Sequence, residues 1–249
     1  MAADSLHPPA LFTERDAWLA GAFAIGTAAL MPLDQDITEE FRDPGPQHSN
    51  ALQAGANDLD VVGNPGVLVA NIALFGIGRV VHVRRMAELG LYGTEAIVVS
   101  GGVTALIKGL AGRARPAVDD NDPDSYVVGR GFGNGDFASL PSGHATAAFA
   151  AAAVVAAESA RWWPHASGYI VPMAYGTATL VALSRVYQNR HWASDVMLGA
   201  GIGTLTGLAV VHFNTAHPKN PINRWLLGMS IAPDPRGGGA LLAWTIHTR

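Results

Sequence analysis

Three cationic side chains stand out because their types and neighbours suit the binding of a phosphate group. Lys108 precedes Arg115 by seven residues, Arg115 is followed by Pro116, and Arg185 follows Ser184. A bound phosphate dianion needs fixed positive charges, and a guanidinium can grip two of its oxygens as a planar fork. These residues therefore predict a phosphate site assembled from separate parts of the chain.

A histidine and a carboxylate lie close behind Arg185. His191 and Asp195 are four residues apart, so on a helix they would share one face. The carboxylate could then hold the proton of one imidazole nitrogen and leave the other free as a nucleophile. This pair predicts nucleophilic attack by His191 on phosphorus, with Asp195 as its orienting partner.

A second histidine belongs to the run Pro141-Ser142-Gly143-His144, which comes directly before an apolar stretch. This pattern is typical of a helix N-terminus, with Ser142 as the capping residue. Backbone N–H groups at Gly143 and His144 would point at a bound phosphate, and glycine lets the anion approach closely. We expect His144 to lie beside the leaving oxygen.

The elements that must position these residues are helices. The chain has 249 residues, of which 49% are hydrophobic and 14% charged, consistent with a single domain over residues 1–249. Six apolar, Ala/Gly-rich stretches predict an all-α, six-helix up-and-down bundle. They cover residues 18–33, 66–81, 94–110, 144–157, 167–183 and 194–213.

Such a bundle brings all the candidate residues to one end, because alternate helices begin and finish there. The connections 34–65 and 111–143 are long and rich in Gly, Pro, Asp and Asn, so we expect loops that contain short helices.

Gly199, Gly203 and Gly207 recur every four residues and predict close backbone contact with a neighbouring helix. Residues 228–249 predict a short terminal β-hairpin.

Charge and composition exclude several classes of partner and cofactor. The net charge of −4 makes nucleic acid an unexpected partner, and the absence of cysteine excludes disulfides and thiolate metal sites. The acidic run 119–124 lacks the glycine and distal glutamate of an EF-hand loop, so we interpret it as a solvated loop. We predict no metal site.

The apolar stretches are long enough for either buried helices or membrane spans. If they are spans, the basic residues outside the phosphate site indicate an orientation. The predicted catalytic side retains Arg42, Arg113, Arg130 and Arg190, whereas the opposite side carries Arg15, Arg79, Arg84, Arg85, Arg161, Lys219, Arg224, Arg236 and Arg249. This asymmetry predicts an active site outside the cytoplasm.

Together the motifs K-x6-R-P, P-S-G-H and S-R-x5-H-x3-D resemble those of the type 2 phosphatidic acid phosphatase superfamily, over about residues 94–213. The resemblance implies that His191 forms a phosphohistidine, that Asp195 orients it, and that His144 protonates the leaving oxygen and later activates water. It also implies a phosphate cradle and no metal or other cofactor, because the cations supply the charge stabilisation. The cradle residues are Lys108, Arg115, Ser142, Gly143 and Arg185.

The superfamily contains membrane lipid phosphatases, soluble acid phosphatases and vanadium-dependent haloperoxidases. The chain is short for a haloperoxidase, and the uncharged last helix is most similar to that of the lipid phosphatases. We therefore expect a metal-independent phosphatase of the bacterial inner membrane, acting on phospholipid or isoprenoid lipid phosphates, either monoesters or pyrophosphate-linked. The alternatives are an exported, periplasmic soluble acid phosphatase and, ranked below it, a vanadium-dependent haloperoxidase or a catalytically inactive phosphate-binding membrane protein.

Overall fold

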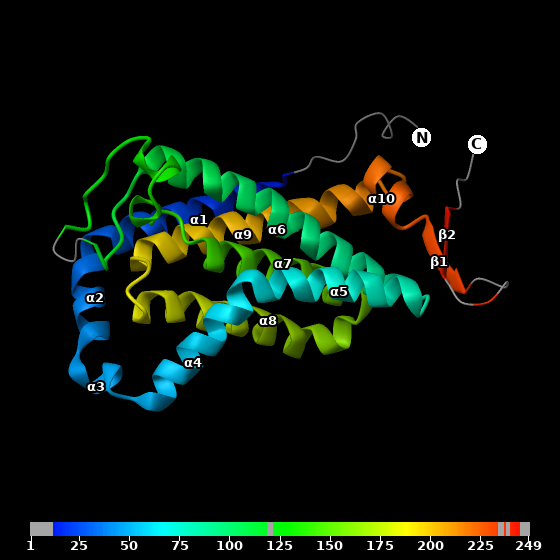
Figure 1. The fold of residues 1–249 in the computed structure, drawn as a ribbon. Helices are drawn as coiled ribbons and strands as arrows, with labels where there is room; N and C mark the ends of the chain where they lie inside the picture. The colour runs from blue at the N-terminus through cyan, green and yellow to red at the C-terminus, as the bar shows by residue number, and fades with distance from the viewer. Residues whose placement is uncertain (1–11, 119–121, 234–236, 238–239, 245–249) are drawn as a thin grey trace.

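Each of the six predicted stretches corresponds to a long helix in the computed structural model, which describes residues 12–118, 122–233, 237 and 240–244. The all-α bundle is thereby confirmed (Figure 1). The long helices are α1 (Glu14–Leu30), α5 (Val67–Val80), α6 (Arg84–Ala111), α7 (Gly143–Trp162), α8 (Pro164–Tyr187) and α9 (Ala193–Ala216).

Helix α7 lies at the centre of the bundle, where it packs against α6, α8 and α9. Its sequence explains this position, because the alanines at 145, 150 and 153 are fully buried and their small side chains let three neighbours approach. The apolar cluster between α6 and α7 includes Leu91, Ile97 and Val154. This packing fixes the start of α7 relative to the ends of α6 and α8.

The predicted glycine repeat joins α9 to α7. A Cβ atom at Gly199 would lie 2.5 Å from the carbonyl oxygen of Ser142, and one at Gly203 would lie 2.3 Å from that of Thr146. Gly207 makes the third such contact one turn further on. Because no side chain fits there, the repeat sets the closest approach of the two helices and holds the beginning of α9 against the beginning of α7.

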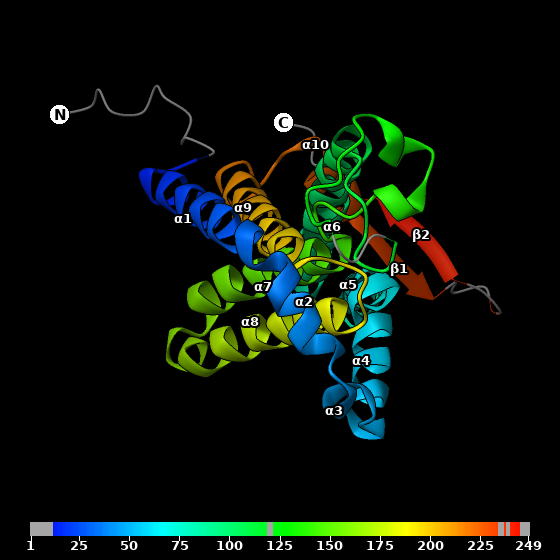
Figure 2. The same cartoon turned by 90° about the vertical axis from the view of Figure 1, so that its left-hand side faces the viewer.

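The segment 34–65 is far more helical than a loop with short helices. After the turn η1 (Met31–Leu33), it forms α2 (Asp34–Arg42), α3 (Pro44–Gln47), α4 (Asn50–Val61) and the distorted turn η2 (Val62–Gly66), which leads directly into α5. Helix α4 begins where the Ser49 hydroxyl accepts a hydrogen bond from the Leu52 N–H. Figure 2 shows α2 crossing the end of the bundle, where it contacts α8 and α9.

The other long connection is irregular, as predicted. Between α6 and α7 the chain forms two short turns, η3 (Arg130–Phe132) and η4 (Gly135–Phe137). Within the acidic run, Asp122 and Asp124 are exposed, in agreement with a solvated loop, whereas residues 119–121 lie outside the described residues. This connection stands at the same end of the bundle as α2 (Figure 1).

The chain after α9 forms α10 (Pro221–Leu226) and the strands β1 (Met229–Pro233) and β2 (Ala240–Trp244). The strands pair antiparallel with Met229 opposite Trp244, which corresponds to the predicted hairpin. Strand β1 lies against α5. The hairpin stands at the far end of the molecule from α2 (Figure 1).

The outside of the bundle is apolar. Trp18 is 80% exposed, Tyr169 78% and Met173 72%. Within the described residues, five helical segments are long and apolar enough to cross a membrane: Glu14–Arg42, Asn50–Val80, Arg84–Ala111, Pro164–Tyr187 and Ala193–Ala216. Exposed large apolar side chains over such segments are stable when lipid covers them.

Candidate active site

Lys108 lies in the last turn of α6, where the chain turns sharply into the loop. Its ammonium group donates hydrogen bonds to the carbonyl oxygens of Ala138, at 2.5 Å, and Ser139, at 3.2 Å. The turn requires Gly112, which has φ of 59°, and a Cβ there would lie 1.8 Å from the Val127 carbonyl oxygen. Lys108 is thus held against the loop that leads into α7.

Arg115 follows this turn and is positioned by backbone carbonyl groups. Its Nε donates to the carbonyl oxygen of Gly135 at 2.8 Å, and Nη1 donates to that of Arg190 at 3.3 Å. These contacts tie the loop before α7 to the chain segment immediately before His191. The guanidinium is therefore oriented by neutral carbonyl groups, and among the described residues no carboxylate forms an ion pair with it.

The start of α7 forms as predicted. Ser142 is the N-cap, and its Oγ accepts a hydrogen bond of 3.5 Å from the N–H of Ala145. Its own N–H donates to the backbone carbonyl oxygen of Asp195, at 2.9 Å. A Cβ at Gly143 would meet Lys108 Cε at 3.9 Å, so glycine keeps the space between α7 and Lys108 open. The first N–H groups of α7 are available to an anion in that space.

His191 and Asp195 face each other, although by a different route from the one predicted. His191 precedes α9, which begins at Ala193, so the two residues do not share a helix face. Nevertheless, Nδ1 of His191 lies 3.5 Å from Oδ2 of Asp195, slightly too far for a hydrogen bond. With Nδ1 directed at the carboxylate, Nε2 is the ring nitrogen directed away from it.

The environment of His191 keeps its ring neutral. Burial lowers the pKa of His191 to about 3; Lys108 and Arg115 add to the effect, and Asp195 opposes it. The desolvation cost of a charged imidazole therefore outweighs the attraction of the carboxylate. A neutral imidazole has the free lone pair that a nucleophile needs.

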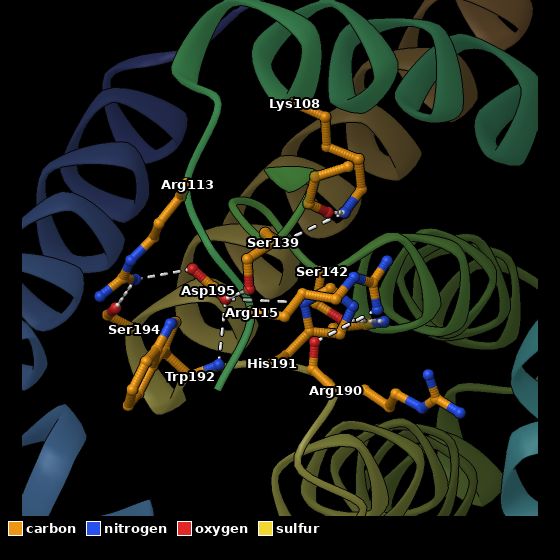
Figure 3. A network of polar contacts seen from close by, with 12 residues as sticks. Lys108, Arg113, Arg115, Ser139, Ser142, Arg190, His191, Trp192, Ser194 and Asp195 are labelled. Carbon is orange, nitrogen blue, oxygen red and sulfur yellow. Dashed lines mark hydrogen bonds and ion pairs between the residues drawn. The ribbon is translucent and has the colours of Figure 1, made fainter. Parts of the chain in front are cut away.

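Asp195 is held by a network that the sequence did not reveal (Figure 3). Its Oδ1 accepts a hydrogen bond of 2.7 Å from Nη1 of Arg113, and its Oδ2 accepts bonds from the Ser139 hydroxyl, at 2.5 Å, and the Trp192 N–H, at 3.0 Å. Since Trp192 precedes α9, the last contact also caps that helix. The carboxylate is thereby fixed from three sides.

Arg113 joins Asp195 to a second buried acid, Asp34. Nη2 of Arg113 lies 2.8 Å from Asp34 Oδ2, and all three side chains are inaccessible to solvent. Asp34 also accepts a hydrogen bond of 2.8 Å from the N–H of Ser194. The start of α2 is thus tied to the start of α9. Arg113 was counted among the basic residues on the catalytic side when the membrane orientation was predicted, but it is buried inside the site.

The remaining predicted residues, His144 and Arg185, share an acidic partner that was not predicted. Asp60, near the end of α4, lies with Oδ1 2.8 Å from Nε2 of His144 and also accepts a hydrogen bond from Nη1 of Arg185. Nη1 of Arg185 donates in addition to the Gln188 side chain. No signal in the sequence pointed to this contact, because Asp60 lies in the segment 34–65 that was predicted to be a loop; only the structure places it in the apolar helical segment Asn50–Val80.

All eight predicted site residues therefore lie around the beginnings of α7 and α9 and the ends of α6 and α8. Within the described part of the chain, no group of three His, Cys, Asp or Glu side chains has the arrangement of a metal site. Cations and helix N–H groups that surround a neutral histidine suit the binding of an anion with a tetrahedral centre and attack on that centre.

The comparison with known proteins agrees with this geometry. The family model of the PAP2 superfamily matches residues 90–219, and all eight predicted site residues lie within that range. The chain therefore belongs to the PAP2 superfamily, the type 2 phosphatidic acid phosphatase group that its motifs resemble.

Two individual relatives extend the comparison. Lipid A 1-phosphatase of Porphyromonas gingivalis (strain ATCC 33277) is 30% identical over 151 residues, which cover 60% of this chain and 29% of that protein. The crystal structure of the first transmembrane PAP2-type phosphatidylglycerolphosphate phosphatase from Bacillus subtilis matches with a TM-score of 0.61 at 22% identity, over 82% of this chain and 97% of that one. The second match establishes a shared fold.

Proposed function

We propose that this protein is a membrane phosphatase that hydrolyses lipid phosphate esters through a phosphohistidine intermediate. The observation that carries the proposal is the buried, neutral His191, which is backed by Asp195 and lies within electrostatic reach of Lys108 and Arg115. The membrane association follows from the five apolar helical segments and their exposed side chains. The superfamily and the lipid A 1-phosphatase relative support a phosphate on a lipid as the substrate.

In the first step, Nε2 of His191 attacks phosphorus, and the bond from phosphorus to the leaving oxygen breaks. His144 gives that oxygen a proton, so the alcohol leaves neutral. Asp195 stabilises the Nδ1–H of the ring, which becomes positively charged as the N–P bond forms. Lys108, Arg115 and Arg185, with the N–H groups at the start of α7, stabilise the charge on the equatorial oxygens.

In the second step, His144, now neutral, takes a proton from a water molecule as that water attacks the phosphorus of the phosphohistidine. The N–P bond breaks, inorganic phosphate leaves, and His191 regains its lone pair. His144 is protonated again and ready for the next cycle. Both steps balance with water as the sole co-substrate, and the fixed cations provide the charge stabilisation throughout.

The position of the site suits a lipid substrate. It lies at one end of the long helices, which is where headgroups lie when a bundle of this length crosses a bilayer (Figure 1). The opposite end carries Arg84, Arg85 and Arg161. Because Arg113 is buried and ion-paired, it no longer counts as a basic loop residue on the catalytic side. The excess of basic residues on the opposite side, which favours an external active site, is then larger.

The test is phosphate release from a lipid phosphate in detergent micelles, with the purified protein and its His191→Ala variant, with and without EDTA. We expect release by the unchanged protein in both buffers and none by the variant. No release by the unchanged protein from lipid or water-soluble phosphate esters would contradict the proposal. Vesicles of known sidedness and a membrane-impermeant substrate test the orientation, and release of the protein by an alkaline wash would favour the soluble alternative.

A further inference from the structure

Asp60 is an acidic residue at the site for which the two-step reaction has no use. It lies on α4, inside the apolar segment Asn50–Val80, where a carboxylate is costly unless it serves a function. Its side chain is 43% exposed, and its Oδ1 contacts both Nε2 of His144 and Nη1 of Arg185. Asp60 therefore faces solvent and the site at once.

Asp60 contacts one nitrogen of the Arg185 guanidinium, Nη1. It takes Nη1, which also donates to Gln188 Oε1 at 2.5 Å, whereas the buried Nε of Arg185 has no hydrogen-bond partner. A guanidinium presents Nε and Nη2 together as one bidentate edge, and Nη1 points elsewhere. The contact that Asp60 makes is therefore not on the Nε and Nη2 edge, which is the edge that a phosphate would use in the proposed reaction.

Asp60 lies on the side of the site where the leaving group would be. In the proposed reaction, which this inference assumes, His144 gives its proton to the leaving oxygen. Asp60 touches His144, and η2, which follows α4, packs on the same ring: a Cβ at Gly63 would lie 3.0 Å from His144 Cδ2. The end of α4 and η2 therefore form the wall beside the leaving group.

A carboxylate in that wall distinguishes leaving groups by charge. It repels a leaving group that is itself an anion and accepts hydrogen bonds from the hydroxyl groups of a neutral one. We propose that Asp60 is a specificity-determining residue that favours phosphate monoesters of neutral alcohols and disfavours diphosphates, whose leaving group is a second phosphate. The chain contains a matched control in Asp58, an exposed acid on the same helix.

The experiment compares decyl phosphate with decyl diphosphate in micelles, because both carry the same chain and differ in the leaving group. We expect Asp60→Asn to raise the ratio of kcat/KM for the diphosphate to kcat/KM for the monophosphate by about tenfold to a hundredfold, as removal of one repulsive charge a few ångströms away allows. Asp58→Asn and Asp60→Glu should keep the ratio of the unchanged protein.

A purely structural role for Asp60 would lower kcat/KM for both substrates by the same factor, and an unchanged ratio in Asp60→Asn overturns the proposal. The unchanged protein supplies a test that needs no variant: it should prefer the monophosphate, although a diphosphate has the better leaving group, and a preference for the diphosphate also overturns the proposal. Failure of the proposed function has a different signature, because the unchanged protein would then hydrolyse neither compound.

Discussion

Arg113 Nη1 and Asp195 Oδ1 lie 2.7 Å apart in a fully buried ion pair, which connects the loop after α6 to the first turn of α9. On its other side Arg113 contacts Asp34, so one cation compensates two buried acids. Buried ion pairs contribute little net stability but are costly to break, because the remaining charge has no partner. The arrangement therefore holds Asp195 in place behind His191 by making every alternative position unfavourable.

This relationship predicts a large loss of stability in Arg113→Met. The variant leaves Asp34 and Asp195 buried without their cation, and we expect a loss of about 3–5 kcal/mol, as found when one partner of a buried pair is removed. The measurement is thermal unfolding of the purified protein in detergent. Arg224→Met, which removes an exposed arginine of α10, serves as the control and should unfold near the original temperature.

Asp195→Asn should lower turnover far more than it lowers substrate affinity. The amide cannot stabilise the charge that develops on His191, and comparable changes in histidine–carboxylate pairs cost about 10⁴-fold in kcat. Because Arg113 keeps Asp34 as a partner, we expect a smaller loss of stability than in Arg113→Met. Turnover is measured on protein that a melting curve shows to be folded; near-normal turnover in such protein would refute the orienting role.

The role of His144 as a general acid predicts a dependence on the leaving group. In His144→Ala, alkyl phosphates should lose far more activity than nitrophenyl phosphate, because nitrophenolate leaves without needing a proton. The measurement is kcat/KM for both substrates in the variant and in the unchanged protein. Equal losses for the two substrates would argue that His144 acts in some other way.

His191 should stay neutral well below the usual pKa of histidine. Burial lowers its pKa to about 3, so its ring should titrate neither near pH 6.5 nor at pH 5 in the folded protein. Below pH 6.5 the unfolded chain binds a proton at His191 that the folded chain does not bind, so the free energy of unfolding falls as the pH is lowered. Nitrogen-15 NMR of labelled histidines, assigned with His191→Ala, measures the ring directly, and a midpoint near 6.5 would contradict this environment.

The residues of the site that belong to the short motifs could be predicted from the sequence. The motif spacings supplied eight residues whose positions around the helix ends agree with one site, because each motif begins or ends a helix and an up-and-down bundle brings those ends together. The glycine repeat of α9 was equally readable, since close helix contact needs small residues at that spacing wherever the helix lies.

The two acidic partners Asp34 and Asp60 could not be predicted, because they come from a distant segment of the chain. Asp34 and Asp60 lie in the segment 34–65, which its Gly, Pro and Asp content made resemble a loop, and their contacts with Arg113, His144 and Arg185 depend on the tertiary fold. Arg113 resembled a surface loop charge for the same reason.

The most direct test of the central claim is to trap the phosphorylated enzyme. The protein is mixed with a phosphorus-32-labelled lipid phosphate, quenched in alkali, in which phosphohistidine is stable, and digested to locate the label. The account predicts label on the peptide that contains His191, none in His191→Ala, and more in His144→Ala with a good leaving group, since water attack is then slow. Label on His144, or rapid turnover with no labelled protein in any variant, would contradict it.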